Sequence, residues 1–292
     1  MQIGLIGCGN MARALARGWA RPLLCSDPLP DRAAALAAEV HGEALTDNAE
    51  VARRADLVVL CHKPPQLSDV AAEVAPHARA VASILAATTL SDLKHAYPDR
   101  PVYRFMPSLP VEVRQGAVVQ AADPDGPDPQ AADHDGLAGE EAPAGSDAPG
   151  GPEAPAGDVR ASTDREVRAS TDREVHDLFA ELGTLVVLEE RLVDVAMGLM
   201  SCGPAYVALV AEAQIDAGLR HGIPAPQGAQ LVVQTLAGTA ELLRRRENDT
   251  HAVRREVSSP GGVTAKGLDA LERAGLRAAF SDALDAVLGK AT

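Results

Sequence analysis

The sequence predicts an α/β protein in which a doubly wound parallel sheet is followed by a smaller, all-helical domain. The first observation is that short apolar strands alternate with helix-forming segments as far as residue 188, the pattern of a parallel sheet with helices on both faces. The second is that no strand signal occurs after Glu190. We therefore expect two domains, residues 1–190 and residues 191–292.

The first eighteen residues carry the most specific local signal. An apolar strand at 2–6 runs directly into the sequence GCGNMA, and a helix follows as far as Trp19. This order matches the Gly-x-Gly-x-x-Gly/Ala pattern of dinucleotide-binding turns. Gly7 permits the tight turn, Gly9 lets a pyrophosphate approach the backbone, and Ala12 lets the helix pack closely on the strand. The alternative is an ordinary strand-to-helix turn.

The second strand, 23–26, ends at Ser26-Asp27, and Asp27 follows Gly7 by twenty residues. An acid at this point normally accepts hydrogen bonds from the adenosine ribose and disfavours a 2′-phosphate. The spacing therefore favours dinucleotide binding. A turn or helix-capping role for Asp27 before Pro28 remains the alternative.

Apolar runs bounded by Gly, Pro and polar residues define the other elements of the first domain. The predicted helices span 31–40, 48–55, 67–74, 89–96 (capped by Thr88 or Thr89) and 175–182, and the predicted strands span 56–61, 80–85, 101–105, 116–120 and 184–188. Further helices are predicted at 193–200, 204–221, 226–246 and from 265 onward. The helix 226–246 is apolar around most of its circumference, so we expect a second subunit to cover it in an obligate dimer.

Residues 121–174 interrupt the alternation of strands and helices. They are rich in Ala, Pro, Gly and Asp, and the octapeptide VRASTDRE occurs at 159–166 and again at 167–174. Ten acidic residues and no Lys or Arg lie within 121–158, so this segment contributes −10 of the net charge of −14. Such a composition cannot bury enough apolar surface to offset its chain entropy. We predict a disordered acidic insertion; a functional acidic segment is the alternative.

Composition also argues against several classes of protein. A net charge of −14 disfavours nucleic acid as a partner. No apolar run approaches the roughly 18 residues of a membrane span, and no secretory signal is evident, so we expect a cytoplasmic protein. The four cysteines lack Cys-x-x-Cys spacing and the eight histidines lack ligand spacing, which predicts reduced thiols and no metal.

A second stretch with chemical character precedes the last helical region. The sequence SSPGGVT at 258–264 combines small residues with two glycines. A turn of this kind before a helix forms a nest of backbone amides suited to an anion such as a carboxylate. A plain glycine loop between two helices is an equally good interpretation of this stretch alone.

Five motifs in order resemble the pyrroline-5-carboxylate reductase family. They are GCGNMA at 7–12, KP at 63–64, RFMP at 104–107, GPAY at 203–206 and SSPGGVT at 258–264. The last is the most specific, and the resemblance covers all but the insertion. It implies a Rossmann-type domain and a helical dimerisation domain that interlocks two subunits, often within larger rings. It also implies NADPH or NADH as cofactor, a small-molecule substrate, and a homodimer or larger homo-oligomer. The net charge and the short apolar runs predict neither a nucleic-acid nor a membrane partner.

The resemblance also implies roles for individual residues, with each active site joining the nucleotide domain of one subunit to helices of its partner. For the cofactor these are Gly7, Gly9, Asn10 and Met11 at the pyrophosphate, Ser26 and Asn48 at the adenosine end (where the spacing already places Asp27), Cys61, Lys63 and Pro64 at the nicotinamide ribose, and Met106 and Pro107 at the nicotinamide. For the substrate they are Ser259, Gly261, Gly262 and Val263 at the carboxylate and Thr264, the catalytic residue, at the ring nitrogen.

The implied chemistry is hydride transfer from the nicotinamide to the carbon of a cyclic C=N bond, which needs orientation more than acid catalysis. No lysine occurs between Val175 and Thr264, which argues against hydroxyacid dehydrogenases that use a lysine acid in the helical domain. Three departures from the family pattern, His62, Ser108-Leu109 and Met200-Ser201-Cys202, leave two alternatives open. These are a reductase of another cyclic imine, and a dinucleotide-binding protein with a regulatory role and no turnover.

Overall fold

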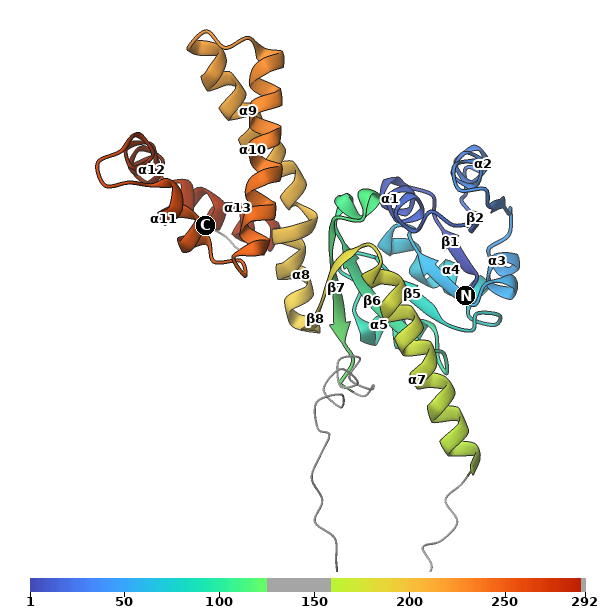
Figure 1. Cartoon of the computed structure of the whole chain (residues 1–292). Coiled ribbons are helices and arrows are strands. Elements are labelled where there is room, and N and C mark those ends of the chain that lie inside the picture. Colours follow the sequence, from blue (N-terminus) through green and yellow to red (C-terminus); the bar gives the residue numbers. More distant parts are fainter. Residues whose placement is uncertain (125–158, 290–292) are drawn as a thin grey trace, which may run out of the picture. The chain divides into compact units, whose positions relative to one another are not determined.

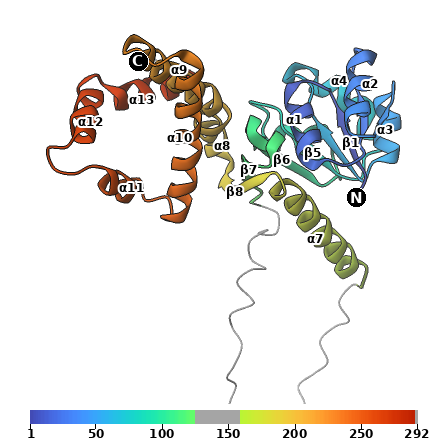
Figure 2. The same cartoon turned by 45° about the horizontal axis from the view of Figure 1, so that its top comes forward.

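The computed structural model describes residues 1–124 and 159–289. The chain divides into two compact units, Met1–Met197 and Gly198–Thr292. This boundary falls seven residues after the predicted boundary at 190/191. The first unit contains the sheet and its covering helices, and the second unit is helical (Figures 1 and 2).

Eight strands form one sheet in the order β3-β2-β1-β4-β5-β6-β7-β8. Their bounds are β1 Ile3–Ile6, β2 Leu24–Ser26, β3 Glu43–Ala44, β4 Leu57–Leu60, β5 Val81–Ser83, β6 Val102–Pro107, β7 Gly116–Ala122 and β8 Gly183–Glu189. Neighbours are parallel except β6 and β7, which pair antiparallel. The predicted doubly wound parallel sheet is confirmed, with the antiparallel pairing of β6 and β7 as its one exception among the strands described. The eight residues 108–115 are too few for a parallel crossover, which needs a dozen or more.

Helices cover both faces of the sheet. Helices α1 (Asn10–Trp19), α2 (Pro30–Glu39) and α7 (Val159–Ala180) share one core, whereas α3 (Asn48–Arg54), α4 (Leu67–Val74) and α5 (Leu90–Ala96) share the other. Strand β4 shows why both cores form. Its residues alternate between them, with Leu57 and Val59 in the first and Val58 and Leu60 in the second, all fully buried. A continuous apolar run is the expected signature of a strand buried on both faces.

Helix α7 corrects the predicted extent of the insertion. Residues 159–174 are helical, and 121–122 belong to β7; the part from 125 to 158 lies outside the described residues. The ring of Phe179 stacks on Phe105 with centroids 3.7 Å apart, and Trp19 meets Phe179 edge-on at 5.4 Å. The Tyr103 hydroxyl donates to Asp172. The repeat lacks an apolar face, so its helix could not be predicted from periodicity. The helix is held by the aromatic contacts of Phe179, which follows the repeat.

The second unit follows a wide helical turn. After α8 (Glu190–Ala196) come the π-helical segment Met197–Ser201, α9 (Gly203–Arg220), α10 (Ala225–Arg245), α11 (Thr250–Val257), α12 (Val263–Arg273) and α13 (Leu276–Val287). Helix α11 was not predicted, because Val253 is its only buried residue. Its start did carry a signal, since the Asp249 side chain accepts a hydrogen bond from the Ala252 amide at 2.9 Å.

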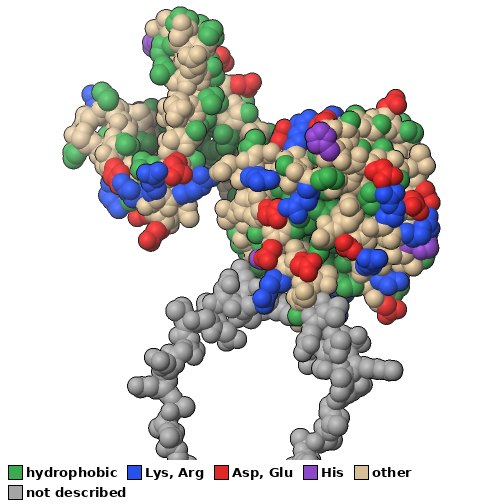
Figure 3. Space-filling view, turned by 45° about the vertical axis from the view of Figure 1, so that its right-hand side comes forward, with side chains coloured by type: hydrophobic (Ala, Val, Ile, Leu, Met, Phe, Trp, Pro, Cys, Tyr) green, Lys and Arg blue, Asp and Glu red, His purple; other side chains and the backbone are tan. Residues whose placement is uncertain are grey.

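The helices of the second unit expose most of their apolar side chains. Val253 is the only buried hydrophobic residue among the described part of this unit. The exposed large hydrophobics are Leu199, Val207, Leu209, Leu219, Ile223, Leu231, Val233, Val257, Val263, Leu271, Leu276 and Phe280, and hydrophobic side chains lie open on the helices in Figure 3. By length and composition alone, Glu190–Arg220 could also cross a membrane, contrary to the prediction that no segment qualifies. A surface this apolar requires a covering partner.

Candidate functional site

The glycine turn lies where the strand order reverses, between β1 and β4, the usual ligand position in a doubly wound sheet. Gly7 has φ +94°, and a Cβ there would lie 2.7 Å from backbone atoms of Cys61 and His62. A Cβ on Gly9 would meet nothing within 4 Å, and Gly9 caps α1 without a side-chain hydrogen bond. The amides of Asn10 and Met11 thus begin an open helix N-terminus, which suits a pyrophosphate.

Asp27 holds the glycine turn from the end of β2. One carboxylate oxygen accepts from the Cys8 amide at 2.8 Å, and the other accepts from the Leu29 amide at 2.9 Å. The Cys8 side chain is buried. A hydrogen bond with the Cys25 thiol, together with burial, raises the pKa of the Cys8 thiol. Asp27 therefore fixes the loop as well as standing at the predicted adenosine end.

A hydrogen-bonded chain runs beside Asp27. Ser26 is 3 % exposed, and its hydroxyl donates to Asn48 Oδ1 at 2.6 Å, while Asn48 Nδ2 donates to Glu73 Oε2 at 2.7 Å. Ser26 and Asn48 were both predicted at this end of the cofactor, and the structure brings them together. Sequence reasoning missed Glu73, which lies on α4, 25 residues after Asn48, with no local motif to mark it.

The end of β4 brings together the residues predicted at the nicotinamide ribose. Cys61 is half-buried and burial raises its pKa, Lys63 is exposed, and Pro64 begins a short 3-10 helix, Pro64–Gln66. The Nδ1 atom of His62 lies 3.0 Å from the Lys63 carbonyl oxygen, so Nδ1 carries the proton in the neutral ring. Its Nε2 atom is buried without a hydrogen-bond partner, and burial lowers the pKa of His62.

Met106 and Pro107, predicted at the nicotinamide, are buried at the end of β6. The next residue, Ser108, is one of the departures from the family pattern. Its hydroxyl accepts from the Ala117 amide and its own amide donates to the Ala117 carbonyl, both at 2.9 Å. Ser108 therefore joins β6 to β7 rather than presenting a free hydroxyl.

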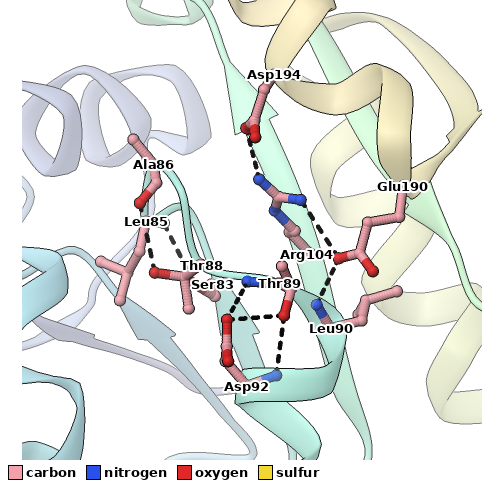
Figure 4. A network of polar contacts seen from close by, with 10 residues as sticks. All are labelled: Ser83, Leu85, Ala86, Thr88, Thr89, Leu90, Asp92, Arg104, Glu190 and Asp194. Atoms are coloured by element: carbon pink, nitrogen blue, oxygen red, sulfur yellow. Dashed lines mark hydrogen bonds and ion pairs between the residues drawn. The ribbon is translucent and has the colours of Figure 1, made fainter.

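Figure 4 shows a network around Arg104, whose side chain is almost completely buried. Its guanidinium pairs with Glu190 at 3.3 Å and with Asp194 at 2.8 Å, both on α8, and Glu190 also accepts from the Leu90 amide. Arg104 thus ties β6 to the helix on which the chain leaves the sheet. The network also includes the cap of α5, which is Thr89, bonded to the Asp92 amide and carboxylate.

The glycine loop before α12 belongs to the second unit, whereas the predicted cofactor residues belong to the first. Gly261 has φ +71°, and Gly262 caps α12 while its amide donates to the Ser259 carbonyl at 3.0 Å. No side chain caps this helix, Val263 is 86 % exposed, and Thr264 is half-buried in the first turn. The loop therefore presents an open, positively polarised helix end.

Two family models match the chain. The model described as pyrroline-5-carboxylate reductase dimerisation matches residues 190–292, and the model described as NADP oxidoreductase, coenzyme F420-dependent, matches residues 2–87. Pyrroline-5-carboxylate reductase of Synechocystis is 30% identical over 98% of this chain and 95% of its own. The enzyme of Thermus thermophilus is 31% identical, with the same coverage of both chains.

Solved structures share the fold over the whole length. Pyrroline carboxylate reductase of Plasmodium falciparum with NADP bound has a TM-score of 0.74 at 24% identity, covering 98% of this chain and 95% of that one. The structure of 1-pyrroline-5-carboxylate reductase from Streptococcus pyogenes has a TM-score of 0.75 at 25% identity, covering 99% of this chain and 97% of that one.

Proposed function

The chain belongs to the pyrroline-5-carboxylate reductase family, and from this premise we propose that it reduces 1-pyrroline-5-carboxylate to L-proline with NAD(P)H, the last step of proline biosynthesis. The observation that carries the proposal is similarity over 98% of the chain. That length includes both the open glycine turn before α1 and the open loop before α12. A protein that only bound a dinucleotide would need the first of these but not the second.

The first unit supplies the proposed cofactor site. The open position at Gly9 leaves room for a pyrophosphate on the amides of Asn10 and Met11. Gly7 contributes the tight turn, because its own amide donates to the Ser26 carbonyl at 2.8 Å. The remaining cofactor positions are Ser26, Asp27 and Asn48 at the adenosine end, Cys61, Lys63 and Pro64 at the nicotinamide ribose, and Met106 and Pro107 at the nicotinamide. When bound, NAD(P)H supplies the hydride.

The second unit supplies the proposed substrate residues. Ser259 and the amides of Gly261 and Val263 hold the substrate carboxylate at the start of α12, and Gly262, whose amide donates to the Ser259 carbonyl, shapes the loop around it. This fixes the imine ring so that its carbon receives the hydride while the C=N electron pair passes to the nitrogen. The hydroxyl of Thr264 then hydrogen-bonds that nitrogen as its electron density rises. A protonated imine already carries the N–H proton of the product, so the chain need not provide a strong acid.

The protein is a homo-oligomer, because its C-terminal part matches a dimerisation family and exposes the apolar faces that such an interface covers. The finer assignment that we propose is a dimer through the second unit, or a larger assembly built on it, in the cytoplasm and without a nucleic-acid or membrane partner. In this assignment the apolar stretch Glu190–Arg220 packs against a second copy of the chain.

Loss of NADH or NADPH absorbance at 340 nm on addition of 1-pyrroline-5-carboxylate tests the proposal, with proline identified as the product. A Gly9→Val variant is the control for the site, because its side chain fills the space left open for the pyrophosphate and turnover should fall with the fold intact. Oxidation of NADH or NADPH on addition of a different cyclic imine, but not on addition of 1-pyrroline-5-carboxylate, would contradict the assigned substrate. Cofactor binding without turnover on any cyclic imine would contradict the assigned activity.

A further inference from the structure

We propose that Glu73, acting with Asp27, makes the adenosine end of the cofactor site select NADH over NADPH. This inference rests on the proposed function, because it concerns the cofactor of that reaction. Its starting point is the hydrogen-bonded chain in which Ser26 donates to Asn48 and Asn48 donates to Glu73. This series of hydrogen bonds begins at the end of β2, where the adenosine ribose is held in folds of this type.

In this series of hydrogen bonds each side chain donates to the next, and the last acceptor is a carboxylate. The Ser26 hydroxyl has one proton and gives it to Asn48, and Asn48 gives an amide proton to Glu73. A 2′-phosphate offers only acceptors and needs donors or cations, whereas a 2′-hydroxyl brings its own donor. The side chains at this edge therefore suit the hydroxyl of NADH better than the phosphate of NADPH.

The charges at this edge favour the same choice. No described residue forms an ion pair with Asp27 or Glu73. The neighbouring cations of α3 are already paired, Arg53 with Asp47 and Glu50 at 3.3 and 3.0 Å, and Arg54 with Glu43. A dianionic 2′-phosphate would meet two carboxylates while the cations of α3 are engaged in other pairs, which costs binding free energy.

Glu73→Gln is the decisive variant, because it removes the charge and keeps the size of the side chain. Glu73 is exposed on α4, so the variant should fold, and its melting temperature provides the check. Fluorescence titration at low salt gives Kd for NADH and for NADPH. We expect the parent to bind NADH about tenfold more tightly, and the variant to gain roughly three- to tenfold for NADPH with NADH within about twofold, the scale of one charge near a surface.

The matched control is Asp177→Asn, which removes an exposed charge from α7, a helix on the other face of the sheet from α4. It should leave the NADPH/NADH ratio unchanged. In the parent protein, the dissociation constants for NADPH and NADH should also become more similar as salt is added, because an exposed charge is screened. Asp27→Asn is less informative alone, because Asp27 also holds the amides of Cys8 and Leu29.

The proposal is overturned if the parent binds NADPH as tightly as NADH, or if Glu73→Gln leaves the ratio unmoved. It is also overturned if the parent prefers NADPH and Arg32→Ala abolishes that preference, since the exposed Arg32 would then hold the 2′-phosphate. Failure of the proposed function is a separate result. It would appear as absent turnover with 1-pyrroline-5-carboxylate, whatever the ratio of the two dissociation constants.

Discussion

At the residue scale, Thr264 is the side chain with the largest proposed effect on catalysis. A donor aimed at the ring nitrogen stabilises the transition state more than the ground state, because the nitrogen gains electron density as the hydride arrives. We expect Thr264→Ala to lower turnover by roughly 10²–10³, the usual loss for one positioned donor, with cofactor affinity nearly unchanged. Thr264→Ser keeps the hydroxyl and should retain much of the activity.

The competing explanation for Thr264 is a purely structural role in the final helices, and the structure makes it weak. The N-cap of α12 is Gly262, and no side chain caps this helix. A lost cap would cost about 1 kcal/mol of stability, visible as a lower melting temperature. Near-parental turnover in a destabilised Thr264→Ala protein would refute the catalytic assignment.

His62 should make stability depend on pH. Burial lowers its pKa in the folded chain, whereas an unfolded chain binds the proton near pH 6.5. Below about pH 6.5 the unfolded state therefore holds more protons than the folded state, and the free energy of unfolding falls as the pH falls. His62→Gln should flatten this slope in melting temperatures taken from pH 7.5 down to 5.5. His95→Gln, an exposed histidine of α5, is the control and should leave the slope intact.

At the element scale, α7 depends on one aromatic anchor. Phe179 contacts both Phe105 and Trp19, and the Trp19 indole donates to the Leu178 carbonyl at 2.8 Å. Phe179→Ala should lower the free energy of unfolding by about 3–5 kcal/mol, as other buried Phe→Ala changes do. Ser170→Ala, on an exposed part of the same helix, should change it by less than about 0.5 kcal/mol. Equal effects in urea titrations of the two variants would show that Phe179 is not the anchor.

The elements differ in how far the sequence could predict them. Helix α4 was predicted with its observed bounds, 67–74, because its apolar spacing and its position between two strands agree. The direction of β7 was open to prediction, because the predicted strands at 101–105 and 116–120 leave a connection of ten residues, shorter than a parallel crossover needs. The helix at 159–174 was missed because its composition resembles that of a disordered chain, and α11 because it buries one residue.

The site residues divide in a similar way. Motifs marked Gly7 and Gly261, whose positive φ angles favour glycine, and Gly9, which leaves open space at the start of α1. Glu73 and the acceptors of Arg104 could not be predicted, because each is contributed by a distant segment that only the packed fold brings near.

At the scale of the whole molecule, the apolar helices should hold the subunits together. Leu231, on α10, is 60% exposed, and Leu231→Asp would place a charge in a surface that a second copy covers. We expect the variant to sediment as a smaller species than the parent and to lose activity. Leu29→Asp replaces a leucine that is 53% exposed in the first unit and is the matched control. An unchanged sedimentation coefficient for Leu231→Asp would remove α10 from the interface.

The near absence of a buried core in the second unit has a further consequence, for how the protein reaches its final state. A unit with Val253 as its only buried hydrophobic residue among those described should gain much of its burial by association, so we expect its folding to be coupled to assembly. By mass action, dilution should then destabilise the second unit, and the melting temperature should rise with protein concentration. A newly made subunit would keep its apolar helices uncovered until it collides with a second copy. The rate of synthesis therefore sets how long that surface stays open to proteases and chaperones.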